Sequence, residues 1–434
     1  MAEIKPIKAW RYNAKLQKEI ENLTSPLFDV VSPQQREALY KNPLNSIHLS
    51  VPKGGEESAD MAADRLAKWK AEGILKQDPL PGIYVYYQYF TLPGSTRERV
   101  RKGFITFIKA YDWDENVILR HENTIPKSVN DRIDLLDKTQ LNVSATHGLY
   151  SDPDFELEPY MDESMEMPLG ELEDYQGVKE VVSVIHDAKI IKKFIAKIAS
   201  QQIILADGHH RYEGSLLYRK KMIEQNPNHT GQEGYNFHMM YLTNADSDDL
   251  RILPTHRLIK DIPDFSEKEI LKALEDDFII KTLENPEDVH EIILGKMWAF
   301  GLLFKENTYK IRLKPEKISE LNWNFPNEVK HLDLTVLHYF FIEKILGIKG
   351  KEQRSSESIQ FERNFTACIR KLLKNEVQCA LITKEISMEQ VKKVCNTGFT
   401  MPQKSTYFYP KTICGFLFGS IQEDEFELPS YFRV

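Results

Sequence analysis

Polar and reactive side chains gather on one short stretch, "IILADGHHRYEGSLLYRK", at residues 203–220. The apolar run at 203–206 is typical of a buried strand, and the residues from 209 onward are typical of a helix. Between the two lie residues that a simple hinge would not all need: Asp207, Gly208, His209, His210 and Arg211. The pattern therefore predicts a chemically active turn between a strand and a helix.

The residue types at this turn favour the binding of a phosphate or a nucleotide. Gly208 permits a tight turn, and the first amides of the following helix lack partners within that helix. Arg211 suits a bidentate contact to phosphate, while His209 and His210 suit hydrogen bonding or proton transfer near neutral pH. Glu213 suits either fixing the arginine or holding a metal ion.

Two other interpretations of the turn stay open. Aspartate and glycine are ordinary turn residues, so the turn could be purely structural. The two histidines could bind a metal, but neighbouring positions on a helix point about 100° apart, so one zinc ion would not readily take both. The chain contains neither G-x-x-x-x-G-K-[ST] nor G-x-G-x-x-G, which excludes the standard P-loop and Rossmann interpretations.

Three other segments carry suitable chemistry. The loop "SPLFDVVSP" holds Asp29, a carboxylate that could accept a proton from a substrate hydroxyl, bind Mg²⁺, or only satisfy turn amides. The segment "RHENTIPKSVNDR" holds Glu122 and Arg132 and is either a pocket wall or a solvated loop. The segment "MPQKSTYFYPK" offers donors for phosphate oxygens: Lys404, Ser405, Thr406 and Lys411. We expect these segments to meet at the Gly208 turn.

The elements that must position these residues are mixed strands and helices. Aromatic and β-branched runs at 82–90 and 101–111 predict a hairpin, and 298–313 predicts a second one. Residues 187–200 and 331–347 are typical of helices. This order indicates an α/β fold of mixed α+β character, with mixed sheets and flanking helices.

The length of 434 residues exceeds one ordinary core and predicts several domains. We expect three consecutive ones: an N-terminal α/β domain at 1–150, a central domain with the DGHHR turn at 151–262, and a C-terminal α+β domain at 263–434.

The composition is that of a globular protein, with 41% hydrophobic and 28% charged residues. The sequence has no apolar run of the roughly 20 residues that a membrane helix needs and no signal-peptide pattern at its start, so we expect a cytoplasmic protein without membrane contact. The four cysteines lie far apart and are expected to be reduced structural thiols. The formal charge of −8 argues against a nucleic-acid partner.

Four separated signatures resemble one known family. The stretches "SPLFDVVSP", "ILADGHHRYEGSLLYRK", "LPTHRL" and "MPQKSTYFYPK" are similar, in this order along the chain, to the bacterial and archaeal family of unknown function numbered 1015. That family usually continues with "ETAL" after the turn, whereas this chain has Gly214 in place of a small helix former, a change we expect to matter little to the chemistry. The family name carries no activity.

The turn also resembles the central motif of the partition-protein-B and sulfiredoxin-like superfamily, which includes free-serine kinases with a "DGHHR"-type turn. The resemblance implies a nucleotide-binding core of that type. It implies that Gly208 to Arg211 cradle nucleotide phosphates, with Asp207 beside them.

Together these features predict a phosphotransferase that uses ATP or ADP with Mg²⁺ on a small hydroxyl metabolite, serine or phosphoserine first. Asp29, Glu122, His209 and His210 are the candidate catalytic residues. Arg132 and Lys404 are expected to neutralise charge, and the partner is a small phosphorylated substrate. A phosphohydrolase and a non-catalytic nucleotide-binding regulator remain alternatives, and the sequence sets no oligomeric state.

Overall fold

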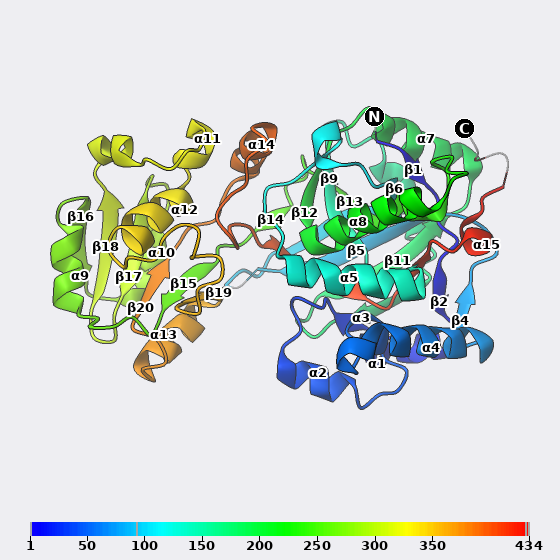
Figure 1. Ribbon diagram of the computed structural model, residues 1–434, viewed down its shortest axis with the longest axis horizontal. Coiled ribbons are helices and arrows are strands. Elements are labelled where there is room, and N and C mark those ends of the chain that lie inside the picture. The colour runs from blue at the N-terminus through cyan, green and yellow to red at the C-terminus, as the bar shows by residue number, and fades with distance from the viewer. Residues whose placement is uncertain (1, 93, 430–431, 433–434) are drawn as a thin grey trace. The chain divides into compact units, whose positions relative to one another are not determined.

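The computed structural model describes residues 2–92, 94–429 and 432, and it divides into two compact units (Figure 1). The first unit is built from three stretches of chain, Met1–Arg120, Thr124–Arg251 and Pro410–Val434. The second comprises His121–Asn123 and Ile252–Tyr409. These units divide the chain differently from the three consecutive domains expected from the sequence, because the C-terminal stretch pairs with strands of the first unit.

A nine-stranded mixed sheet forms the centre of the first unit, in the order β10-β11-β5-β6-β13-β9-β12-β7, with β1 (Ile4–Lys5) paired to β6. β9 runs parallel to β13 and antiparallel to β12, so the sheet is mixed as expected. The strand bounds are β10 (Gly170–Glu173), β11 (Lys179–Ile185), β5 (Ile83–Thr91), β6 (Glu98–Lys109), β13 (Phe237–Asn244), β9 (Thr146–Tyr150), β12 (Ile203–Asp207) and β7 (Ile118–Leu119).

The first predicted hairpin is confirmed. β5 and β6 pair antiparallel from Tyr84↔Ile105 to Thr91↔Glu98. Their aromatic and β-branched side chains are buried almost throughout, because the sheet is covered on both faces.

Helices cover the two faces of this sheet. The core on one face contains side chains of α4 (Ser58–Ala71) and α5 (Pro126–Thr139), and the core on the other contains α7 (Ala188–Ala199). α8 (His209–Gln225) contributes Tyr218 to the first core and Leu216 to the second. α8 also packs along α5, which brings the residues of the two helices together.

Short strands tie the C-terminal stretch to the first unit. β22 (Ile413–Cys414) pairs with β3 (Ser25–Pro26), and β23 (Gly419–Ser420) pairs with β8 (Leu141–Asn142). Residues more than 250 positions apart in sequence therefore belong to one core, and no local pattern announces such pairing.

The second unit has its own six-stranded sheet, in the order β16-β18-β17-β20-β15-β19. The predicted hairpin at 298–313 is confirmed as β17 and β18. The strand bounds are β16 (Phe278–Leu283), β18 (Thr308–Leu313), β17 (Ala299–Leu303), β20 (Cys379–Ile382), β15 (His256–Ile259) and β19 (Ile359–Glu362).

Helices flank this second sheet as well: α9 (Glu267–Leu274), α10 (Val289–Ile293) and α13 (Phe365–Leu373). α14 (Met388–Asn396) packs against α11 (Asn327–Lys330). The core segment expected as one helix at 331–347 consists of α12 (Asp333–Val336) followed by a π-helical segment, Leu337–Glu343. Among the described residues, no helix is long and apolar enough to cross a membrane. Cys368, Cys379, Cys395 and Cys414 are buried free thiols.

Candidate functional site

The predicted strand-to-helix turn is confirmed in the first unit. β12 ends at Asp207, Gly208 adopts a left-handed conformation with φ of 91°, and α8 begins at His209. A Cβ atom at Gly208 would lie 2.6 Å from Cγ2 of Thr146 and 2.9 Å from Nη2 of Arg211. Both the backbone conformation and the close approach therefore require glycine at this position.

Asp207 is the centre of an ion network at this turn. Its Oδ2 accepts a hydrogen bond from Nη2 of Arg211 at 3.0 Å, and its Oδ1 accepts one from Nζ of Lys411. Burial alone would raise the pKa of this carboxyl, but the charges of Lys411 and Arg211 outweigh it and hold the pKa well below its usual range. Asp207 is therefore ionised throughout the physiological range.

The guanidinium of Arg211 is largely committed to the protein. Besides Asp207, it donates from Nη1 to the carbonyl of Ala145 at 2.6 Å and to Oγ of Ser144 at 3.1 Å. Within the described chain its Nε is buried and has no hydrogen-bond partner. Arg211 thus holds the turn together, and the phosphate contact assigned to it from the sequence stays a prediction.

The two histidines of the motif occupy different surroundings. His209 is buried, whereas His210 is half-buried and its Nε2 lies 3.0 Å from the backbone N of Ile125. Because that backbone N–H donates, Nε2 of His210 accepts this hydrogen bond. The catalytic role of the two rings stays a prediction.

Cations dominate the electrostatics around the turn. His147, opposite Asp207 on β9, has its pKa held well below the usual value by burial and by the charges of Arg101, Lys411 and Arg211. Burial and the charge of Arg211 lower the pKa of His238 to about 3. Both rings are neutral at pH 7, so the turn keeps an excess of positive charge.

Buried polar side chains hold Lys411 in position beside the turn. Nε2 of Gln88 donates to the carbonyl of Lys411 at 3.0 Å, and Arg101 donates to the carbonyl of Pro410 and to Oε1 of Gln88. Gln88 also donates to Glu180 at 3.0 Å, and burial raises the pKa of Glu180 to about 8. These contacts fix the start of the C-terminal stretch beside Asp207.

Arg132 and Asp29 belong to the same unit as the turn. The guanidinium of Arg132 lies over the ring of Phe28, 4.4 Å from its centroid, and donates to the carbonyl of Ser50 at 2.9 Å. Burial and the charge of Arg211 lower the pKa of Arg132. The negative charge of Asp29, a solvent-exposed residue in a turn, raises the pKa of Arg132. The two arginines are therefore electrostatic neighbours, as the shared-site prediction requires for this part.

The carboxylate of Glu213 contacts protein donors in this structure. Its Oε2 accepts a hydrogen bond from the indole Nε1 of Trp113 at 2.7 Å and lies 3.9 Å from Nη1 of Arg120. No group of three histidine, cysteine, aspartate or glutamate side chains in the described part of the chain could hold a metal ion. The assignment of Glu213 as a metal ligand stays a prediction.

The other predicted residues, Glu122, Lys404, Ser405 and Thr406, belong to the second unit. Within that unit Nε2 of His121 lies 2.7 Å from Oγ1 of Thr406, and buried Arg257 donates to the carbonyl of Lys404. Their grouping with the Gly208 turn stays a prediction.

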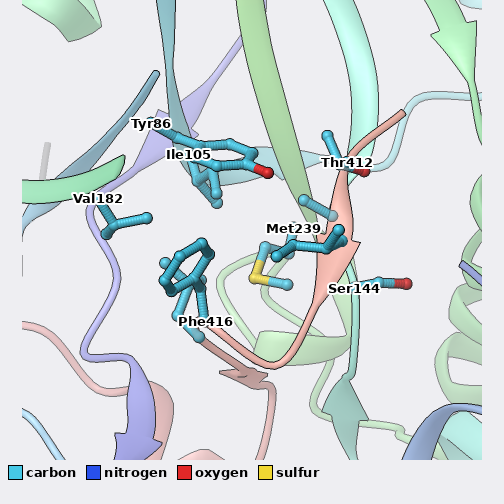
Figure 2. Close-up of a pocket in the computed structure, with 10 residues that line it drawn as sticks. Tyr86, Ile105, Ser144, Val182, Met239, Thr412 and Phe416 are labelled. Carbon is cyan, nitrogen blue, oxygen red and sulfur yellow. The ribbon is translucent and has the colours of Figure 1, made fainter. Parts of the chain in front are cut away.

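A small cavity adjoins the partners of Arg211 (Figure 2). Ser144 and Ala145 line it together with apolar side chains that include Met239 and Phe416. Its volume of about 20 Å³ holds roughly one water molecule, so it is not itself a nucleotide pocket.

Sequence reasoning missed several members of the site. Lys411 was recognised only as one donor of its motif, and neither Ser144 nor His147 carries any sequence signal, because each is a single polar residue in or beside a strand. Their roles arise from pairing across the sheet.

The fold and the turn define a mixed α/β protein with a cation-rich strand-to-helix site. The chain belongs to the family described as protein of unknown function (DUF1015), whose model matches residues 4–335, which confirms the membership expected from the four signatures. No curated protein matches the chain.

Several solved structures are similar to this chain at low identity. A mutant free serine kinase in complex with AMP is 15% identical, with 70% of this chain and 87% of that chain covered at a TM-score of 0.36. A conserved hypothetical protein from Pyrococcus furiosus is 13% identical, with 74% and 97% covered and a TM-score of 0.36. SbnI from Staphylococcus aureus, truncated at its C-terminus, is 10% identical, with 74% and 90% covered and a TM-score of 0.36.

Proposed function

We propose that the protein is a phosphotransferase that uses ATP or ADP to modify the hydroxyl group of a small metabolite. The observation that carries the proposal is the excess of positive charge at the strand-to-helix turn. Arg211 and Lys411 share the single carboxylate of Asp207, and Arg132 lies close enough for its pKa to respond to Arg211. Such a site attracts a multiply charged anion.

The backbone of the turn also has features of an anion-binding site. Gly208 brings the chain into a conformation that a side chain would block, and the amides at the start of a helix of 17 residues face the same end. In this proposal the α8 amides and Lys411 bind phosphate oxygens, while Arg211 supplies charge and orients Asp207. Phosphoryl transfer requires mainly such positioning and charge neutralisation.

The remaining roles follow the sequence predictions. Asp29, exposed in the first unit, is the candidate base for the substrate hydroxyl or a ligand of Mg²⁺. Mg²⁺ commonly keeps most of its ligands from water and phosphate oxygens, so a single protein carboxylate is compatible with its binding. Glu122, Lys404, Ser405 and Thr406, in the second unit, remain candidates for the same reaction.

Serine and phosphoserine are the first substrates to test, because the DGHHR turn resembles that of free-serine kinases. The experiment incubates the protein with Mg²⁺, ATP or ADP, and a panel of hydroxyl metabolites, and follows phosphorylated product by ³¹P NMR. Nucleotide-dependent transfer supports the proposal. Release of phosphate from phosphoserine without nucleotide would indicate a phosphohydrolase, and a thermal shift with nucleotide but no turnover would indicate a regulator.

A further inference from the structure

One corner of the second unit's sheet is left open to solvent. β16 is one of the two edge strands, and among the described residues it pairs only with β18, in the register Ile279↔Arg312 and Lys281↔Lys310 (Figure 1). Directly opposed residues of an antiparallel pair share one face of the sheet. These four side chains therefore lie together on the same face.

α10 covers the neighbouring part of this face but stops short of the corner. Its Val289 lies so close to Gly301 of β17 that a Cβ there would be 2.2 Å from Cγ2 of Val289. Leu283 and Leu303, next along the same face, are buried beneath the helix in one apolar cluster. The loop that follows α10 then runs along the edge of the open corner.

This loop adds a fourth cation and is tied to the corner. Nε of Arg312 donates to the carbonyl of Met297 at 3.2 Å, and Nζ of Lys296 donates to the carbonyl of Ile292 at 2.6 Å. Both acceptors are neutral, so neither removes the positive charge. We call the four side chains Lys281, Lys296, Lys310 and Arg312 the basic corner.

The basic corner has no acidic partner in the described part of the chain: none of its four side chains takes part in an ion pair. The pKa of Lys310 is lowered by partial burial and by the charges of Lys296, Lys281 and Arg312. Like charges placed directly opposite each other, as Lys281 and Lys310 are, destabilise a sheet. The repulsion between these cations is therefore not offset by an ion pair within the described residues.

Apolar side chains border the basic corner. Ile279 is 53% exposed, Leu294 66% and Met297 57%, the last two on the loop after α10. Exposed apolar residues grouped beside unpaired cations are typical of a ligand surface rather than of a solvated face.

We infer that the basic corner binds an oligophosphate group, either free or at the end of a nucleotide. The backbone positions that carry the strand cations lie about 5 Å apart across the strands and about 7 Å apart along them. An oligophosphate concentrates three or four negative charges within the same span, whereas an acidic peptide carries one charge per side chain. This site is separate from the β12–α8 turn and does not rest on the proposed function.

The test compares the wild-type protein with the double variant Lys281→Gln/Lys310→Gln by calorimetric titration with sodium triphosphate. Loss of two charged contacts should weaken binding at this site about a hundredfold, at roughly tenfold or more for each contact. The melting temperature should stay the same or rise, because the variant relieves repulsion between like charges. Lys305→Gln, on an exposed lysine in the β17–β18 turn of the same unit, is the matched control and should bind as the wild type does.

Stoichiometry separates this inference from the proposed function. If the turn in the first unit also binds triphosphate, the wild type should bind two molecules and the double variant one. If the turn does not bind triphosphate, the wild type should bind one molecule and the double variant none. A second titration, with ATP, distinguishes a free oligophosphate from a nucleotide. If ATP binds at this site more tightly than triphosphate does, the base contacts the apolar side chains that border the basic corner. Unchanged triphosphate binding in the double variant, an equal loss in Lys305→Gln, or binding of polyglutamate instead of triphosphate would each overturn the inference.

Discussion

Asp207, at the end of β12, and Arg211, in the first turn of α8, form an ion pair four residues apart, with Nη2 of the arginine 3.0 Å from Oδ2 of the aspartate. Their side chains are 13% and 6% exposed, so the pair is buried. The pair links the end of the strand to the start of the helix. Lys411, 204 residues further along the chain, donates a hydrogen bond to the same aspartate. This arrangement changes what a substitution at Arg211 should do.

The sequence alone leads one to expect that Arg211→Ala leaves the fold intact and weakens only ligand binding. The buried contacts predict a loss of stability as well, on the order of 1–3 kcal/mol, because the carbonyl of Ala145 and Oγ of Ser144 lose their donor while Lys411 still pairs with Asp207. Chemical denaturation measures this loss. Nucleotide affinity, measured by calorimetry below the unfolding transition, should fall at least tenfold.

Asp207→Asn is the matched control for Arg211→Ala. It breaks the same ion pair but keeps the guanidinium, so stability should fall while nucleotide affinity is retained or increases. Equal losses of affinity in the two variants would show that Arg211 acts on the ligand only through the fold.

Glu180 should make stability depend on pH. Burial raises its pKa to about 8 in the folded protein, against 4.5 for an ordinary glutamate, and Tyr86, Gln88, Arg101, Asp174 and Tyr241 surround it. The folded state therefore holds a proton that the unfolded state has lost, and the stabilising contribution is complete below pH 4.5 and disappears as the pH rises through 8. The free energy of unfolding should fall by about 1.4 kcal/mol for each pH unit in this window.

Glu180→Gln imitates the protonated side chain, so its unfolding free energy should lose this slope between pH 4.5 and 8. Urea titrations at a series of pH values measure both proteins. A slope that persists in the variant would assign the dependence to other groups.

Gly208→Ala should be far more destabilising than the same change at another glycine with positive φ. At Gly208 the added Cβ meets Thr146 at 2.6 Å, whereas at Gly231, with φ of 83°, no atom lies within 4 Å. Both variants bear the left-handed backbone cost of about 1–2 kcal/mol. Thermal unfolding should show a clear extra loss only for Gly208→Ala, and similar losses would contradict the close approach.

Gly214→Ala tests the contact between α8 and α5. Alanine improves helix propensity by roughly 1 kcal/mol, but its Cβ would lie 3.0 Å from Cβ of Arg132. We expect no net gain in stability, because the two helices must separate slightly. A melting temperature raised by several degrees would show that Arg132 yields freely and that the glycine has no packing role.

Local sequence determined the elements that carry the site. The apolar run ending at Asp207, the glycine at 208 and the helical pattern after it specify strand, turn and helix without help from distant residues, and the structure has all three. The hairpin of β5 and β6 was equally predictable, since alternation and turn residues are properties of neighbouring positions. The capping box of Ser387 and Gln390 starts α14 for the same reason.

Tertiary structure alone decided what the reactive side chains contact. In the sequence, Arg211 is a residue type suited to binding phosphate. In the structure its partners are Asp207, Ala145 and Ser144, because the pairing of β9 with β12 brings these residues within reach. Lys411 reaches Asp207 because the chain returns to the first unit after the second one is complete. Charge pairing across a sheet depends on register and on which segments meet, and neither is encoded in the spacing of nearby residues.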